Sequence, residues 1–227
     1  ADRYIAFIQH AFSPETAAFR NFLGYDRRWL EDEGSQDSQG RALWALGVVV
    51  SSSADQRMRA VASVLFRRAI PTAERLSSPR AMAFALLGVN EYMQTLPGDS
   101  SAKRLREVLA DKLMRAFSVD ADGGWRWPDA LVTYSNASLP HALISTGQRL
   151  GRGDMVETGL DVLRWLLSLQ IIEGHFVPIG NDGWCTPDGA RRARFDQQPI
   201  EADTTIAACV EAFRITGDSE WLGNTLC

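Results

Sequence analysis

Apolar residues recur at helical spacing in successive blocks along almost the whole chain, and these blocks are of two alternating kinds. In one kind, such as Gly40 to Val50, nearly every side is apolar, which predicts a buried helix. In the other kind, such as Asp55 to Ala69, charged residues interrupt the apolar positions, which predicts a helix with one face in solvent. No series of alternating strand-like residues competes with this pattern. The sequence therefore predicts a mainly α fold.

The pair of a buried and an amphipathic helix repeats along the chain. The hairpins repeat every 40 to 65 residues, roughly. Since one helical hairpin cannot bury its own apolar face, successive hairpins must stack on one another. The stack is either an open solenoid or a closed toroid, and the long, uneven links rich in Trp and Gly favour the toroid. The further predicted helices are Pro79 to Met93, Ser101 to Phe117, Asn136 to Leu150, Met155 to Gln170 and Asp203 to Ile215, with Asp2 to Phe12 ending an earlier one.

Three links each follow an amphipathic helix and precede a buried one. They are Tyr25 to Gln39, Val119 to Ser135, and Ile171 to Ala202. Connectivity places all three at the end of the stack where the buried helices begin. Within the third link, Gly174 to Pro178 is predicted to form a short β-ribbon.

Composition and motifs exclude several function classes. The net charge of -4 and the pI near 5.4 give no basic footprint, so we expect no nucleic-acid partner. No apolar run reaches the roughly 18 residues of a membrane span. Three cysteines without CxxC spacing and three histidines without a cluster predict no metal site and a cytoplasmic protein. Motifs of zinc proteases, serine hydrolases and nucleotide-binding loops are absent, so we expect no cofactor.

Several short motifs carry a resemblance to a known superfamily. They are DRRW at 26–29, DSQGRALW at 37–44, GHF at 174–176, NDGW at 181–184 and FDQQP at 195–199. Together they resemble the (α/α)6 six-hairpin glycosidase-like superfamily, and more narrowly the helical domain found alone or fused behind glycosyltransferases in bacterial sugar-processing gene sets. The sequence holds about four hairpins, so we expect an incomplete (α/α)6 barrel. We expect it to form a single domain over residues 1–227, truncated at both ends.

The resemblance implies a carbohydrate site at the rim where the inner helices begin. It also implies an oligosaccharide or polysaccharide substrate and a glycosyltransferase domain or partner. Three functions follow from it as hypotheses: an enzyme that hydrolyses or otherwise processes a glycosidic bond, a non-catalytic saccharide-binding or scaffolding module, and a sugar isomerase or epimerase. The third ranks last, because only His141 and His175 are available to serve such chemistry.

Asp196 and Glu201 are the candidate catalytic pair. Glycoside hydrolysis requires one carboxyl group to protonate the leaving oxygen while a second handles water or the anomeric carbon. The alternative is structural: Asp196 orders a turn, Glu201 lies at the positive end of the next helix, and Asp203 caps that helix. Five extended residues can span up to ~17 Å, so the spacing leaves retaining and inverting chemistry open.

Further polar residues near predicted helix starts are candidates for binding sugar hydroxyls. Asp37 precedes the helix at Gly40 and Asn136 precedes the third inner helix, and both also suit a helix cap. His141 lies about one and a half turns after Asn136, where a hydrogen-bonded structural histidine is the more common case.

Tryptophans in the links are candidates for stacking on sugar rings. Trp125, Trp127 and Trp184 stand beside glycine-containing turns, and Asp129 and Gln197 would bind hydroxyl groups near them. The alternative is that the tryptophans anchor their loops, since each aromatic side chain buries about 150–250 Å².

Overall fold

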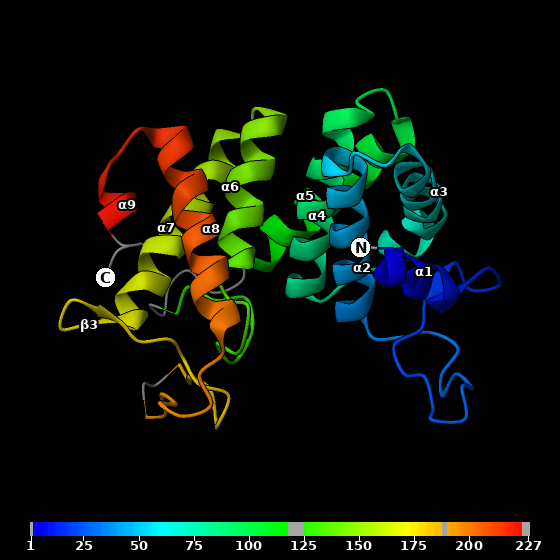
Figure 1. Cartoon of the computed structure of the whole chain (residues 1–227). Coiled ribbons are helices and arrows are strands. Elements are labelled where there is room, and N and C mark those ends of the chain that lie inside the picture. Colours follow the sequence, from blue (N-terminus) through cyan, green and yellow to red (C-terminus); the bar gives the residue numbers. More distant parts are fainter. Residues whose placement is uncertain (1, 118–124, 188–189, 224–227) are drawn as a thin grey trace. The chain divides into compact units, whose positions relative to one another are not determined.

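The computed structural model describes residues 2–117, 125–187 and 190–223, which are mostly helical as predicted (Figure 1). They fall into two compact units, Ala1–Lys112 and Leu113–Cys227. In the described part of the chain, no helix is both long and apolar enough to span a bilayer. The elements of the first unit are α1 (Asp2–Ala11), β1 (Phe12–Ser13), β2 (Ala18–Phe19), α2 (Gln36–Ser52), α3 (Gln56–Ala73), α4 (Pro79–Thr95) and α5 (Ser100–Phe117), which continues into the second unit.

Helices α2 and α4 run parallel and approach backbone to backbone. A Cβ atom added at Gly47 would lie 2.1 Å from the carbonyl oxygen of Gly88, and one at Gly88 would lie 2.5 Å from that of Leu43. Further along, the Ser51 hydroxyl donates to the Glu91 carboxylate at 2.8 Å. Glycine at the contact removes the side chains that would hold the helices apart. These two helices are the inner pair that the sequence predicts.

The starts of α2 and α4 are joined by one side chain. The Gln36 amide oxygen accepts hydrogen bonds from the backbone N–H groups of Ser77 (2.7 Å) and Ser78 (2.8 Å), directly before α4. Burial differs between the two helices: α4 is buried from Arg80 to Asn90, whereas α2 leaves Val48 38% exposed. The prediction that α2 is covered on all sides is therefore wrong.

The second unit contains α6 (Ser138–Leu150), α7 (Gly153–Gln170), β3 (Ile171–Ile172), β4 (His175–Phe176), α8 (Pro199–Thr216) and α9 (Glu220–Gly223). Helices α6 and α7 form an antiparallel hairpin, in which Gly147 lies against Val156 and Gly159 against Ile144. The predicted β-ribbon is confirmed as the antiparallel pair β3–β4.

Two predicted helix starts are wrong by a few residues. Helix α2 begins at Gln36, where the Ser35 hydroxyl accepts from the Ser38 N–H at 3.2 Å, so neither Asp37 nor Ser38 is the cap. Helix α8 begins at Pro199 with Gln198 at the cap position, so Asp203 lies inside the helix and is exposed. Proline is favoured in the first turn of a helix, because its missing N–H would have no helical partner there.

Candidate functional site

The links of the second unit gather at one end of its helices. Figure 1 shows the segment between α7 and α8, together with the segment that leads into α6, at the end where α6 and α8 begin and α7 ends. The predicted common end is therefore observed for the described parts of these two links. Residues 119–124 of the link Val119 to Ser135 lie outside the described residues.

Glu201 joins the start of α8 to the start of α6. Its side chain is buried, with 1% of the residue exposed. One carboxylate oxygen accepts from the N–H of Ser135, and the other accepts from the N–H of Asn136 at 3.3 Å and from its side-chain amide at 2.8 Å. A carboxylate that accepts several N–H groups in a dry environment is held in one position.

The turn that Glu201 holds is fixed from its other side as well. Ser135 has a φ of 48°, an unusual value for a residue with a side chain. The Asn136 side chain accepts from the Thr133 N–H at 3.1 Å and donates to the Thr133 carbonyl at 3.1 Å. The amide of Asn136 is therefore occupied by the protein, and both Ser135 and Asn136 are fully buried.

Residues 180–187 and 190–196 pair with each other beside this turn. Cys185 exchanges backbone hydrogen bonds with Val132 at 3.0 and 3.1 Å, and the Asn181 N–H donates to the Asp196 carbonyl at 3.0 Å. A Cβ atom at Gly180 would lie 1.8 Å from the Phe195 carbonyl oxygen, so only glycine fits there. The stretches 180–185 and 192–201 thus form one assembly with 132–136, which lies more than 40 positions earlier in the chain.

Arg192 anchors this assembly to the end of α7. Its guanidinium donates to the carbonyl of Leu169 at 3.0 Å and to that of Val177. Burial lowers the pKa of Arg192, and the nearby Arg194 adds to that effect. The assembly is therefore fixed to α7 as well as to α6 and α8.

The two predicted acids are in opposite environments. Asp196 is exposed, has a φ of 57°, and its carboxylate makes no hydrogen bond or ion pair with any described residue. Glu201 is buried and its oxygens are occupied. Gln197 beside Asp196 is exposed and donates from its amide to the Pro178 carbonyl at 3.2 Å. Of the predicted pair, Asp196 is the acid that solvent or a ligand reaches.

The link tryptophans pack on α7. Trp127 is 4% exposed and stacks with Trp165 at a centroid distance of 6.0 Å and an interplanar angle of 24°. Trp125 meets Trp165 edge to face at 5.2 Å, and its indole N–H donates to the backbone carbonyl of half-buried Asp129 at 2.9 Å. Trp125 and Trp127 thus anchor their loop to α7, which is the alternative to stacking on a sugar ring. Trp184 is half-buried, and its indole nitrogen has no hydrogen-bond partner among the described residues.

His141 and Asp37 are not among the residues of this assembly. His141 is half-buried on α6, and burial lowers its pKa to about 4. Asp37 belongs to the first unit, where it forms an ion pair with Arg41 at 2.8 Å, one helical turn further on. The arrangement brings Asn136, Glu201, Asp196 and Gln197 into connected segments.

Two arginines that are not among the predicted site residues lie in the segment that ends at Asp196. Arg191 and Arg194 are exposed, and neither forms an ion pair with a described residue. Their signal is the run ARRARFD at 190–196, which alternates anchoring Arg192 and buried Ala193 with exposed cations. No cluster of His, Cys, Asp and Glu side chains in the described ranges could hold a metal ion.

Comparisons with known proteins bear on the fold. No protein-family model matches this sequence, and no curated protein matches it either. Among solved structures, the chain is similar to an unsaturated glucuronyl hydrolase specific for heparin, with 13% sequence identity and a TM-score of 0.66. The similarity covers 98% of this chain and 63% of the hydrolase chain. At this identity it shows the fold alone, and it confirms the predicted class: mainly α, with stacked helical hairpins of the (α/α)6 type.

Proposed function

We propose that the assembly at the α6–α8 end of the second unit binds a saccharide and processes a glycosidic bond, with Asp196 as its acid–base residue. The observation that carries the proposal is the pairing of an exposed, unengaged Asp196 carboxylate with a backbone fixed on both sides of it. Acid–base catalysis needs a carboxyl group that substrate can reach and that the protein holds in place. The glycosidase-like fold supports a carbohydrate substrate.

Glu201 takes a different part in this proposal. Its oxygens are occupied by Ser135 and Asn136, so it acts as a positioning residue for the turn before α6 rather than as the second acid. Asp182 is the exposed carboxylate nearest along the paired backbone, because its neighbour Asn181 is hydrogen-bonded to Asp196. Asp182 therefore replaces Glu201 as the candidate partner of Asp196.

The exposed arginines favour an anionic saccharide. Arg191 and Arg194 flank the anchored Arg192 in the segment that leads to Asp196, and guanidinium groups bind carboxylate and sulfate groups through paired hydrogen bonds. The structurally similar hydrolase acts on a glucuronyl group, which carries a carboxylate. We therefore place acidic oligosaccharides first among the substrates to test.

The test measures turnover and binding on a panel of neutral and acidic oligosaccharides that includes heparin-derived unsaturated disaccharides. Asp196→Asn is expected to reduce kcat by about 10²- to 10⁴-fold while the dissociation constant changes little, because the amide keeps the shape but cannot transfer a proton. Asp203→Asn, on the exposed surface of α8, is the matched control and should leave both values unchanged. Full turnover by Asp196→Asn would overturn the assignment.

A non-catalytic saccharide-binding module is the second candidate. The burial of Glu201 favours it, because only one acid of the predicted pair remains accessible. In this case the parent chain would bind an oligosaccharide without cleaving it, and Asp196→Asn would only weaken binding. The predicted glycosyltransferase partner belongs to this candidate, and co-purification of the two proteins would test it.

A further inference from the structure

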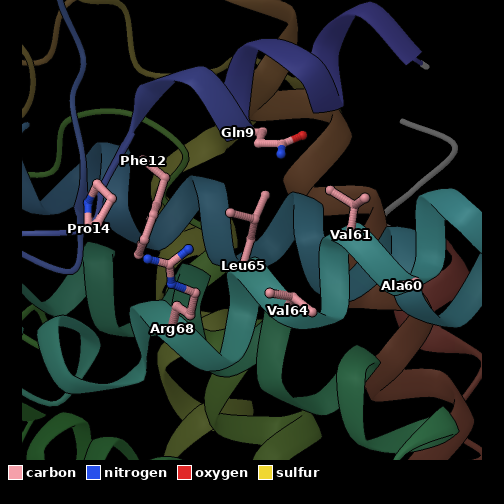
Figure 2. A pocket seen from close by; sticks show the side chains of 8 residues that line it. All are labelled: Gln9, Phe12, Pro14, Ala60, Val61, Val64, Leu65 and Arg68. Atoms are coloured by element: carbon pink, nitrogen blue, oxygen red, sulfur yellow. The ribbon is translucent and has the colours of Figure 1, made fainter.

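A groove on the first unit runs between α1 and α3. Figure 2 shows Gln9 and Phe12 on the α1 side facing Val61 and Leu65 on α3. The groove has a volume of about 380 Å³, and a second hollow of about 200 Å³ continues it past Gln9 and Val61 toward Met58. Together they extend along α3 from Arg57 to Arg68, about 16 Å or three helical turns.

The groove floor is apolar and partly open to solvent. Val61, Val64 and Leu65 lie on one face of α3, at the three- and four-residue spacing of a helical stripe. Val64 is 47% exposed, although it is a large aliphatic side chain beside the buried Leu65 and Phe12. An apolar stripe at the bottom of a helix-sized groove is the form in which proteins bind an amphipathic helix.

The charge on α3 indicates what kind of helix fits. The chain has a net charge of -4, yet α3 contains Arg57, Arg59, Arg67 and Arg68 and no acidic residue. None of these four arginines forms an ion pair with a residue in the described ranges. Arg68 lies over the Phe12 ring at 4.8 Å, at the lip of the groove.

The two ends of the groove differ in charge. Asp2 and Asp55 lie at the Arg57 end, and the Asp55 carboxylate is engaged by the N–H groups of Arg57 and Met58 at the start of α3. The other end holds Arg68, whereas Arg67 lines a separate hollow of the first unit. With two carboxylates and one guanidinium at the Arg57 end, and one guanidinium without a carboxylate at the other, net positive charge lies at the Arg68 end.

We propose that this groove is the docking site for an amphipathic helix of a partner protein whose acidic residues lie at the end beside Arg68. The apolar stripe of the partner helix would cover Val61, Val64 and Leu65, and its acids would pair with the Arg68 guanidinium. A second copy of this chain bound at the groove would form a dimer, which the experiment below distinguishes from a partner helix. A bilayer surface fits less well because Leu65 and Phe12 lie buried below the groove rim.

The experiment uses two fluorescein-labelled helical peptides of about 14 residues. Both carry leucines at i, i+3, i+4 and i+7, and they differ only in having two Glu or two Lys residues at one end. Their binding to the whole chain is followed by fluorescence anisotropy. We expect the Glu peptide to bind at least about tenfold more tightly than the Lys peptide, since charge complementarity at one end of a groove is worth about 1.4 kcal/mol or more.

Two groove variants and two controls make the result specific. Val64→Asp should lower the affinity for the Glu peptide by about tenfold or more, because it places a charge on the apolar floor. Val48→Asp on α2 should leave this affinity unchanged. Arg68→Glu should reverse the preference between the two peptides, and Arg115→Glu on α5 should not. Both changed groove residues have exposed side chains, so circular dichroism should report an unaltered fold.

Several outcomes would overturn the proposal. They are no binding by either peptide at about 0.1 mM, equal binding of both peptides, or binding that is indifferent to Val64→Asp. A concentration-dependent dimer that Val64→Asp abolishes would assign the groove to a second copy instead. Binding to vesicles with anionic lipid that Val64→Asp abolishes, without peptide binding, would assign it to a membrane surface.

Discussion

The carboxylate of Glu201 is buried among the N–H groups of Ser135 and Asn136, and its removal would leave these donors without an acceptor. We predict that Glu201→Gln lowers the free energy of unfolding by about 2 kcal/mol, because the amide NH₂ would face N–H donors. Urea unfolding measures the change, with Asp203→Asn as the control. A Glu201→Gln protein with full stability but no turnover would instead make Glu201 a catalytic group.

His141 is the residue whose protonation should govern stability in mild acid. Its pKa in the folded chain is about 4, against 6.5 for an unperturbed histidine, because burial disfavours the charged ring; Glu211 opposes this effect, and Arg149 and Arg214 add to it. Between these values the unfolded chain binds a proton that the folded chain excludes, so stability falls as the pH falls.

We predict that His141 contributes about 2 kcal/mol to the loss of stability from about pH 7 to about pH 5. Urea unfolding of the parent chain and of His141→Gln at both pH values measures this contribution as the difference between their two losses. Equal losses in the two proteins would show that other groups set the pH dependence.

Asp196 and Glu201 show which features of single residues can be predicted from the sequence. The sequence predicts a polar loop that leads into a helix here, and helix α8 does follow Asp196 and contains Glu201 in its first turn. The burial of Glu201 depends on partners 65 and 66 positions earlier in the chain, which no local pattern contains. The ion pair between Asp37 and Arg41 is easier to predict from the sequence, since residues four apart lie on the same face of a helix.

At the scale of elements, the contact between α2 and α4 depends on glycine. We predict that Gly47→Ala destabilises the chain by about 3 kcal/mol, because the new Cβ would lie 2.1 Å from the Gly88 carbonyl oxygen and push two inner helices apart. The decrease in melting temperature relative to the parent chain measures this loss of stability. Gly98→Ala is the control, since a Cβ atom there has no neighbour within 4 Å. Equal stability of the two variants would contradict the close approach.

Element boundaries were predictable where periodicity decides them, and less so where a cap does. The ends of α5, α6 and α7 coincide with the predicted Phe117, Leu150 and Gln170, because the apolar pattern stops there. The predicted start of α8 is four residues too late, because the prediction assigns Pro199 to the loop, whereas it begins the helix.

At the scale of the whole molecule, this chain and a hydrolase with 13% sequence identity share a fold, because a pattern of apolar and polar positions specifies it rather than particular residues. Alternation of buried and amphipathic helices specifies which face each helix turns inward, and many apolar residues satisfy it. Close helix contacts add the glycine positions 47, 88, 147 and 159. Reaction chemistry lies in the connecting loops, which such a pattern leaves free to vary.

The expectation of a single domain over residues 1–227 yields a prediction for the whole chain. Helix α5 runs without a break from Ser100 to Phe117, across the boundary of the two compact units after Lys112. Because a helix loses stability when one half of it unfolds, we predict that both units unfold in one transition.

Fluorotryptophan labelling tests this prediction, since Trp29 and Trp44 report on the first unit and the other five tryptophans on the second. In a urea titration followed by fluorine NMR, both sets of resonances should lose their folded intensity at the same urea concentration. Gly47→Ala lies in the first unit, yet it should lower that concentration for both sets, because a cooperative chain distributes a local loss over all its parts. A shift confined to Trp29 and Trp44 would mean that the units are separate domains, each stabilised by its own core.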